Sequence, residues 1–144
     1  MNKLLIAGGA ALVIAAGVFA MQTGQAPAET TPQPPEQGAP LANVTVPETL
    51  SQRAQLGQVA FEATCAACHG ENAVGKMGFG PPLVHKVYEP SHHGDMAFVI
   101  AAERGVRQHH WPFGDMPPQQ GLTRADMAGI ITYVRELQRA NGIN

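Results

Sequence analysis

The segment CAACH at residues 65–69 constrains this chain more than any other feature. It holds the only two cysteines in 144 residues, three positions apart, and a histidine directly follows the second. Three kinds of chemistry use this spacing: a dithiol redox pair, half of a tetrahedral zinc site, and a pair of thioether links to a haem. Each of them requires a different sequence context around the two thiols.

That context disfavours zinc and dithiol chemistry. A structural zinc site takes four ligands, but there is no second CxxC, and His109 and His110 are adjacent instead of three to five residues apart. A thioredoxin-like dithiol follows a strand in a βαβ unit, whereas CAACH follows the helix-like run SQRAQLGQVAFEAT. We therefore predict one covalent haem c, with thioethers to Cys65 and Cys68 and with His69 bound to the iron.

The N-terminus predicts export. Residues 4–20 run LLIAGGAALVIAAGVFA without a charge behind Lys3, which gives a positively charged start and a long apolar stretch. Val18-Phe19-Ala20 fits a signal-peptide cleavage site, but seventeen uncharged residues also reach the lower length for a bilayer-spanning helix. A removed signal peptide and an uncleaved anchor both remain open for residues 1–20, and either places the rest of the chain outside the cytoplasm.

The remainder divides into a tether and one domain. Residues 21–47 include QAPAETTPQPPEQGAP, whose five prolines and lack of large apolar side chains predict an extended linker. Residues 48–144 have the length of one small domain. Glycine and proline make up 28 of the 144 residues and aromatic residues only 6%, so a bound prosthetic group would complete an otherwise thin core.

The domain is predicted to be all-α. A first helix covers residues 50–64, and a second covers about ten residues from Asp95, which would cap it, to Gly105. A third covers about residues 124–140, with Thr123 and Asp126 as a capping box. Apolar residues at three- and four-residue steps mark the last helix, and the apolar side of the first is predicted to hold Leu56, Val59, Ala60 and Ala63.

Met116 is the predicted second axial ligand of the haem iron. It lies in WPFGDMPPQQG, where glycine and two prolines predict a stiff, non-helical loop. Met77 follows His69 by only eight residues, too few to reach the opposite haem face easily. Met96 and Met127 fall on helix-like stretches and are predicted to fill the core.

From these motifs, residues 51–140 resemble the class I monohaem c-type cytochromes, which are periplasmic or membrane-anchored electron carriers of bacteria. Gly57 and Phe61 before CAACH, with Ile130 and Tyr133 in the last helix, resemble the positions where the family's terminal helices cross. The resemblance implies the class I cytochrome c fold, with helices wrapped around one haem. It also implies a location on the periplasmic side of the bacterial inner membrane, either anchored or soluble.

Two further segments carry the resemblance. Gly80-Pro81-Pro82-Leu83 is similar to the family's G-P-x-L segment, which implies that Pro81 accepts a hydrogen bond from the His69 imidazole and that Leu83 lies at the cofactor. The G-x-M-P pattern at residues 114–117 is similar to the family's methionine loop, which again implies Met116 as a ligand.

Five other histidines have no assigned role. Arg107 and Trp111, like some of these imidazoles, could donate hydrogen bonds to a haem propionate. A second metal site is not expected, because adjacent histidines point apart on most backbones and no carboxylate or thiol spacing supports one. Ligation of the haem iron by His109 or His110 stays open as an alternative to Met116. The five are His85, His92, His93, His109 and His110.

The predicted function is electron transfer without substrate turnover, because two axial ligands leave the iron no open position. A thioether ligand raises the reduction potential, which favours a respiratory chain with a terminal oxidase, a respiratory complex or a periplasmic reductase as redox partner. From residue 41 onward, eight basic and nine acidic residues predict weak electrostatic steering and apolar docking at the haem edge. Two alternatives remain: a haem subunit of a membrane oxidoreductase, and a haem enzyme or gas-binding domain with a labile sixth ligand. No nucleic-acid signature is present.

Overall fold

The computed structural model describes residues 35–144, which form one compact unit. The predicted signal or anchor segment and the first part of the predicted linker lie outside the described residues. Within residues 35–144, no helix has both the length and the apolar character needed to cross a membrane.

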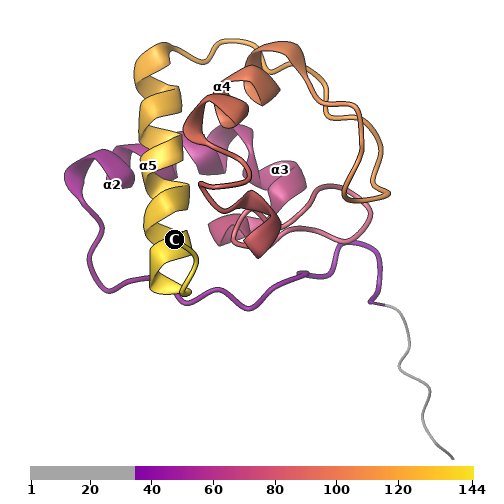
Figure 1. Cartoon of the computed structure of the whole chain (residues 1–144), viewed down its shortest axis with the longest axis horizontal. Coiled ribbons are helices and arrows are strands. Elements are labelled where there is room, and N and C mark those ends of the chain that lie inside the picture. The colour runs from indigo at the N-terminus through magenta and orange to yellow at the C-terminus, as the bar shows by residue number, and fades with distance from the viewer. Residues whose placement is uncertain (1–34) are drawn as a thin grey trace, which may run out of the picture. The chain divides into compact units, whose positions relative to one another are not determined.

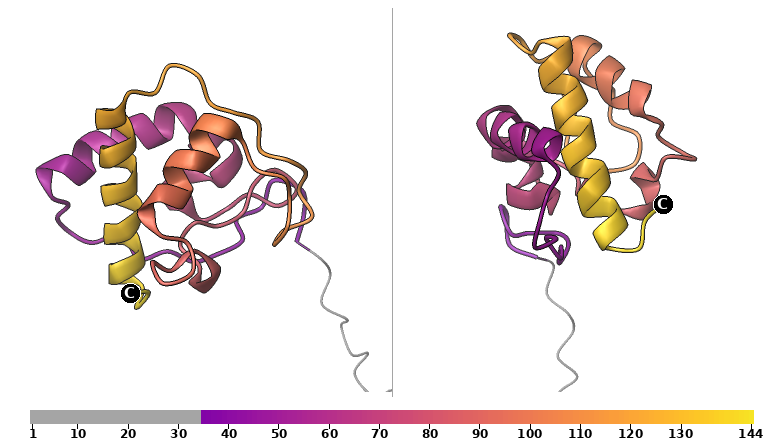
Figure 2. Two further views of the ribbon diagram at one scale, coloured as in Figure 1. Left: turned by 45° about the horizontal axis from the view of Figure 1, so that its top comes forward. Right: turned by 90° about the vertical axis from the view of Figure 1, so that its left-hand side faces the viewer.

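The described part of the chain is helical, as predicted. Its α-helices are α2 (Gln52–Thr64), α3 (Ala66–His69), α4 (Asp95–Arg104) and α5 (Arg124–Ala140), and two short 3-10 turns, η1 and η2, cover Glu71–Ala73 and Lys86–Tyr88. Residues 35–144 contain no strand, only isolated bridges that join Lys76 to Gly80 and Val106 to Met116. Helix α5 packs against both α2 and α4 and lies between them (Figures 1 and 2).

Helices α2 and α5 cross at two glycines. A Cβ atom added to Gly57 would lie 1.9 Å from the carbonyl oxygen of Gly129, so the two backbones are in direct contact. Next to this point, the rings of Phe61 and Tyr133 meet edge to face with centroids 5.7 Å apart, and both are fully buried. The helix crossing predicted at Gly57, Phe61, Ile130 and Tyr133 is therefore present, and Gly129 is the partner that the sequence did not reveal.

The predicted apolar face of α2 is wrong at Leu56, Val59 and Ala63, which are exposed, and right at Ala60, which packs half-buried against the core. Leu56 and Val59 are 69% and 67% exposed, whereas α2 buries Ala54, Gly57 and Phe61. The close approach of α5 explains the difference, because only a residue without a side chain fits where the backbones touch at Gly57, and Phe61 fills the space beside that point against Tyr133.

Helix α5 has the bounds that its sequence predicted. The Asp126 N–H donates to the Thr123 hydroxyl at 3.2 Å, and the Asp126 carboxylate accepts from the Thr123 N–H at 2.9 Å, which completes the capping box. Most of its inward side chains form the core, and their removal from water stabilises the fold by roughly 2 kcal/mol for each fully buried aliphatic residue. These core residues are Met127, Ile130, Ile131, Tyr133, Val134 and Leu137.

Two predictions about α4 need correction. Its N-cap is Gly94, and Asp95 occupies the first helical position without capping. The Asp95 carboxylate instead accepts a hydrogen bond from Arg135 Nε at 2.9 Å, because the buried guanidinium needs a charged partner. Met96 does not fill the core, since it is 64% exposed and lines the open groove between α4 and α5.

The predicted linker extends too far toward the C-terminus. Residues 35–47 belong to the compact unit, and their backbone bonds to it at both ends. The Gly38 N–H donates to the Met77 carbonyl at 2.9 Å, while Thr45 and Asn141 exchange two hydrogen bonds of 2.9 Å each. Residues 35–47 therefore lie on the surface of the domain and are held there by hydrogen bonds of their backbone, which need few large apolar side chains.

Candidate haem site

Cys65, Cys68 and His69 share one tight helical corner. Cys65 ends α2, where its N–H donates to the Phe61 carbonyl at 2.7 Å. The N–H groups of Cys68 and His69 then bond back to the Cys65 carbonyl at 3.2 and 2.9 Å, which forms α3. The thiols are not joined in a disulfide, so the corner holds two free thiols and an imidazole within one turn.

The state of these thiols fits thioether attachment better than redox or zinc chemistry. Burial and the neighbouring Cys68 raise the pKa of the Cys65 thiol to about 11, whereas a redox-active cysteine has a lowered pKa. Among the residues that the structure describes, neither thiol joins a cluster of three metal-ligating side chains. The further ligands that a four-coordinate zinc ion needs are therefore not near the two thiols. The donor set of two thiols and one imidazole fits covalent haem.

His69 is held in the form that a metal ligand requires. Its ring is 9% exposed, and its Nδ1 donates to the Pro81 carbonyl at 2.9 Å, which is the hydrogen bond that the sequence led us to expect. That bond fixes the proton on Nδ1 and leaves the lone pair on Nε2. Burial lowers the pKa of His69, although the bond to Pro81 opposes this, so the ring is neutral at physiological pH.

The segment that carries Pro81 packs tightly against the thiol corner. A Cβ atom on Gly80 would lie 2.7 Å from the Cys68 carbonyl oxygen, so only glycine permits this approach. The Leu83 N–H donates to the Ala73 carbonyl at 3.0 Å, and the Leu83 carbonyl accepts from the buried Gln138 side chain at 2.8 Å. Gln138 therefore fixes the segment from α5, a role that no local sequence signal indicated.

The turn after His69 is fixed in a similar way. Asn72 has a φ of 53°, in the left-handed region, and its side chain accepts a hydrogen bond from the Tyr133 hydroxyl at 2.9 Å. Burial is the main cause that raises the pKa of Tyr133 to about 12, so the phenol keeps its proton and remains a donor. Tyr133, which packs at the crossing of α2 and α5, thus also positions the turn at Asn72 that follows His69.

Met116 lies at the end of a closed loop. It exchanges two backbone hydrogen bonds of 2.9 Å with Val106, and its side chain is half-buried. The Gln108 side chain accepts from the Gly114 N–H at 2.8 Å, and the Asp115 carboxylate accepts from the Gln108 N–H at 2.9 Å. The loop is non-helical, as predicted, and Figure 1 shows it (orange) on the same side of α5 as α3.

Trp111 in this loop carries a buried donor without a well-formed hydrogen bond. Within residues 35–144 its Nε1 makes no hydrogen bond of ordinary geometry, although it lies near enough to the Tyr88 hydroxyl to oppose the burial that raises the pKa of that phenol, and its ring packs edge-on against His85 with centroids 5.3 Å apart. A buried polar group without a partner is costly, so this N–H suits an acceptor such as a haem propionate. Arg107 is exposed, and within the described residues its guanidinium makes no hydrogen bond. The buried indole N–H of Trp111 thus fits the predicted role of a hydrogen-bond donor to a haem propionate, whereas no contact of Arg107 supports that role.

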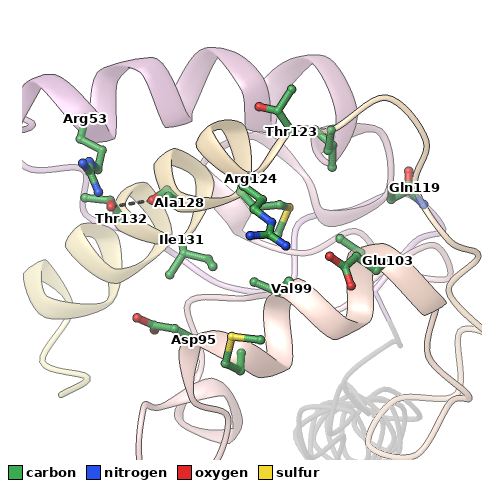
Figure 3. A pocket seen from close by; sticks show the side chains of 14 residues that line it. Arg53, Asp95, Val99, Glu103, Gln119, Thr123, Arg124, Ala128, Ile131 and Thr132 are labelled. Atoms are coloured by element: carbon green, nitrogen blue, oxygen red, sulfur yellow. Dashed lines mark hydrogen bonds between the residues drawn. The ribbon is translucent and has the colours of Figure 1, made fainter.

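A well-defined groove lies elsewhere in the described part of the chain. A groove of about 730 Å³ runs between α4 and α5 (Figure 3) and is lined by residues such as Val99, Glu103 and Ile131. None of the residues predicted to bind haem lines it. We therefore assign the cofactor to the corner formed by α3 and the Pro81 segment.

The structure brings together histidines that we did not expect to meet. His92, His93 and His110 each present a ring nitrogen, and these atoms lie within 4.8 Å of one another. The rings of His109 and His110 have centroids 4.2 Å apart, so the expectation that adjacent histidines point apart is wrong. Desolvation, followed by repulsion from His109, His93 and His92, lowers the pKa of His110.

Comparison with known protein families agrees with this site. The cytochrome c family model matches residues 54–138, more than half of the chain. The chain belongs to the cytochrome c family. A cytochrome c domain holds a covalently bound haem c with its iron, and its members typically transfer electrons outside the cytoplasm. The sequence-based prediction of the family, the fold class and the cofactor is therefore confirmed. No curated protein sequence matches the chain.

Proposed function

We propose that this cytochrome c carries single electrons on a haem whose iron is bound by His69 and Met116. The observation that carries the proposal is the hydrogen bond from His69 Nδ1 to the Pro81 carbonyl, because it aims a neutral imidazole and leaves Nε2 as the ligand atom. When bound, the haem supplies a ferric–ferrous couple for one electron. The protein's own residues orient this ligand, exclude water from it and fix its proton.

The loop of residues 106–116 supports Met116 as the second ligand. Its two backbone bonds to Val106 hold Met116 in place on a non-helical segment. Met127 is buried in the core, and Met96 is exposed on α4. A thioether ligand stabilises ferrous iron, so the reduction potential would be high enough to serve a respiratory chain.

We place the protein on the periplasmic side of the membrane, as an anchored or a soluble carrier. Residues 4–20 support this location through their charge-free composition behind Lys3. We expect its partners to be a respiratory complex, a terminal oxidase or a periplasmic reductase. Phe79, which is 46% exposed beside Gly80 and the Pro81 segment, gives the haem side an apolar contact suited to weakly steered docking.

The optical spectrum of the oxidised holoprotein tests the ligand assignment. A methionine-sulfur ligand gives a weak band at the red end of that spectrum, and this band should be present in the wild type and absent in Met116→Ala. Met77→Ala is the matched control and should keep it. Carbon monoxide should bind quickly to reduced Met116→Ala alone, because only this variant opens the sixth position. If the wild type lacks the band, and if carbon monoxide binds quickly to reduced His110→Ala but not to Met116→Ala, the histidine is the ligand and the proposal fails.

A further inference from the structure

We propose that His92, His93 and His110 form a binding site for a divalent late transition metal ion, separate from the haem iron and selective for Cu²⁺ over Zn²⁺. Their ring nitrogens already lie within 4.8 Å of one another. An ion with bonds of about 2.1 Å holds neighbouring nitrogen ligands about 3.0 Å apart in the tetragonal geometry that Cu²⁺ prefers and about 3.4 Å apart in a tetrahedron. Small side-chain rotations are therefore enough to close the site.

His93 is prepared to act as a ligand. Its Nδ1 donates to the Val87 carbonyl at 2.6 Å, which fixes the proton there and leaves the Nε2 lone pair for a metal. Its backbone is anchored as well, because Arg135 Nη2 donates to the His93 carbonyl at 2.5 Å and the His93 N–H donates to the Glu89 carbonyl at 2.8 Å. The position of His93 is thus fixed in part by Arg135 of α5.

The other two imidazoles are accessible and crowd around His93. His92 and His110 are exposed, and their ring centroids lie 4.6 and 5.2 Å from that of His93 and 5.5 Å from each other. Three cationic rings so close together would repel, so neutral rings that share a metal suit the arrangement better. Because both outer rings face solvent, an ion can enter and keep water at its remaining positions.

The donor set selects the class of ion. The group consists of imidazoles alone, and nitrogen ligands suit copper, nickel and zinc, whereas calcium and magnesium prefer oxygen. With three nitrogen donors and no imposed geometry, the general order of affinities places Cu²⁺ above Zn²⁺.

The site would join two segments that are distant in sequence. His92 and His93 precede α4, while His110 lies in the loop that ends at Met116. A shared ion would cross-link this loop to the turn before α4, and it would bind only the folded protein, because the unfolded chain does not hold the three imidazoles together. Metal binding should therefore raise the midpoint of thermal unfolding.

Titration of Cu²⁺ and Zn²⁺ into the tag-free, oxidised holoprotein tests the proposal by calorimetry. The wild type should bind about one copper per haem iron, as measured by elemental analysis after dialysis, and bind Cu²⁺ more tightly than Zn²⁺. His92→Ala and His110→Ala should each lower the Cu²⁺ affinity at least about tenfold and abolish the thermal shift. His110→Gln serves as the second variant if His110→Ala does not fold.

His85→Asn is the matched control, because it removes an imidazole outside the group. Asparagine can also replace the cap that His85 Nδ1 provides to the Val87 N–H. The control should bind copper as the wild type does, and all variants should keep the wild-type visible spectrum. Copper binding that survives in His92→Ala and His110→Ala, or that is lost equally in His85→Asn, would overturn the proposal. Loss of the iron's sixth ligand in His110→Ala would also overturn it.

Discussion

Substitution of Gly57 by alanine should destabilise the protein, although alanine is the better helix former. The new Cβ atom would lie 1.9 Å from the Gly129 carbonyl oxygen and 2.1 Å from its carbon. To restore an ordinary contact of about 3.4 Å, α2 and α5 would have to part by roughly 1.5 Å, which loosens the packing of Phe61 against Tyr133. Such overpacking costs about 3 kcal/mol, and the helix propensity of alanine returns about 1 kcal/mol.

We therefore expect a net loss of about 2 kcal/mol in the free energy of unfolding, or about 1 M in the urea midpoint at a typical slope. Urea titration of the holoprotein, followed by circular dichroism, measures this loss. Gly129→Ala is the matched control at the same crossing, because its Cβ would lie 3.1 Å from the Gly57 Cα and needs only a small shift. It should stay within about 0.5 kcal/mol of the wild type. Equal effects of the two substitutions would refute the reasoning.

Three further predictions follow from the site and the buried network. Replacing both Cys65 and Cys68 with alanine should abolish covalent haem, which mass spectrometry and a denaturing haem stain detect, because no other thiol exists; normal haem attachment would contradict the assignment. Arg135→Ala should lower the free energy of unfolding by about 3 kcal/mol, since it leaves the His93 carbonyl and the buried Gln138 side-chain oxygen without the guanidinium as donor, and a loss below about 1 kcal/mol in urea titration would argue against that role. Hydrogen bonds from Thr123 lower the pKa of Asp126, so this contribution to stability is present above the carboxyl's ordinary pKa and is lost as the pH falls toward its lowered value. Acid titration should therefore destabilise the wild type more than Asp126→Asn, and identical acid profiles would count against it.

Local signals in the sequence were enough for the haem corner and for α5. The spacing of Cys65, Cys68 and His69 corresponds to the geometry of one helical turn, and the capping box of Thr123 and Asp126 spans only four residues. Backbone sterics and neighbouring side chains decide such features, so no knowledge of the tertiary structure was needed. The Pro81 hydrogen bond depended on resemblance to the family, because nothing local links it to an imidazole twelve residues earlier.

Only the tertiary structure decided which surfaces meet. The sequence pattern predicts Leu56 and Val59 as core residues, but α5 packs on the face of α2 that carries Ala54, Gly57 and Phe61 and leaves Leu56 and Val59 exposed. The helical pattern of α5 does not indicate that Arg135 is buried. Its guanidinium nevertheless bonds to Asp95 of α4 and to the His93 carbonyl in the turn before α4, because a buried guanidinium needs hydrogen-bond acceptors wherever the fold supplies them. His93 and His110 are seventeen residues apart on segments without periodicity, so the path of two loops, and no local rule, brings their rings together.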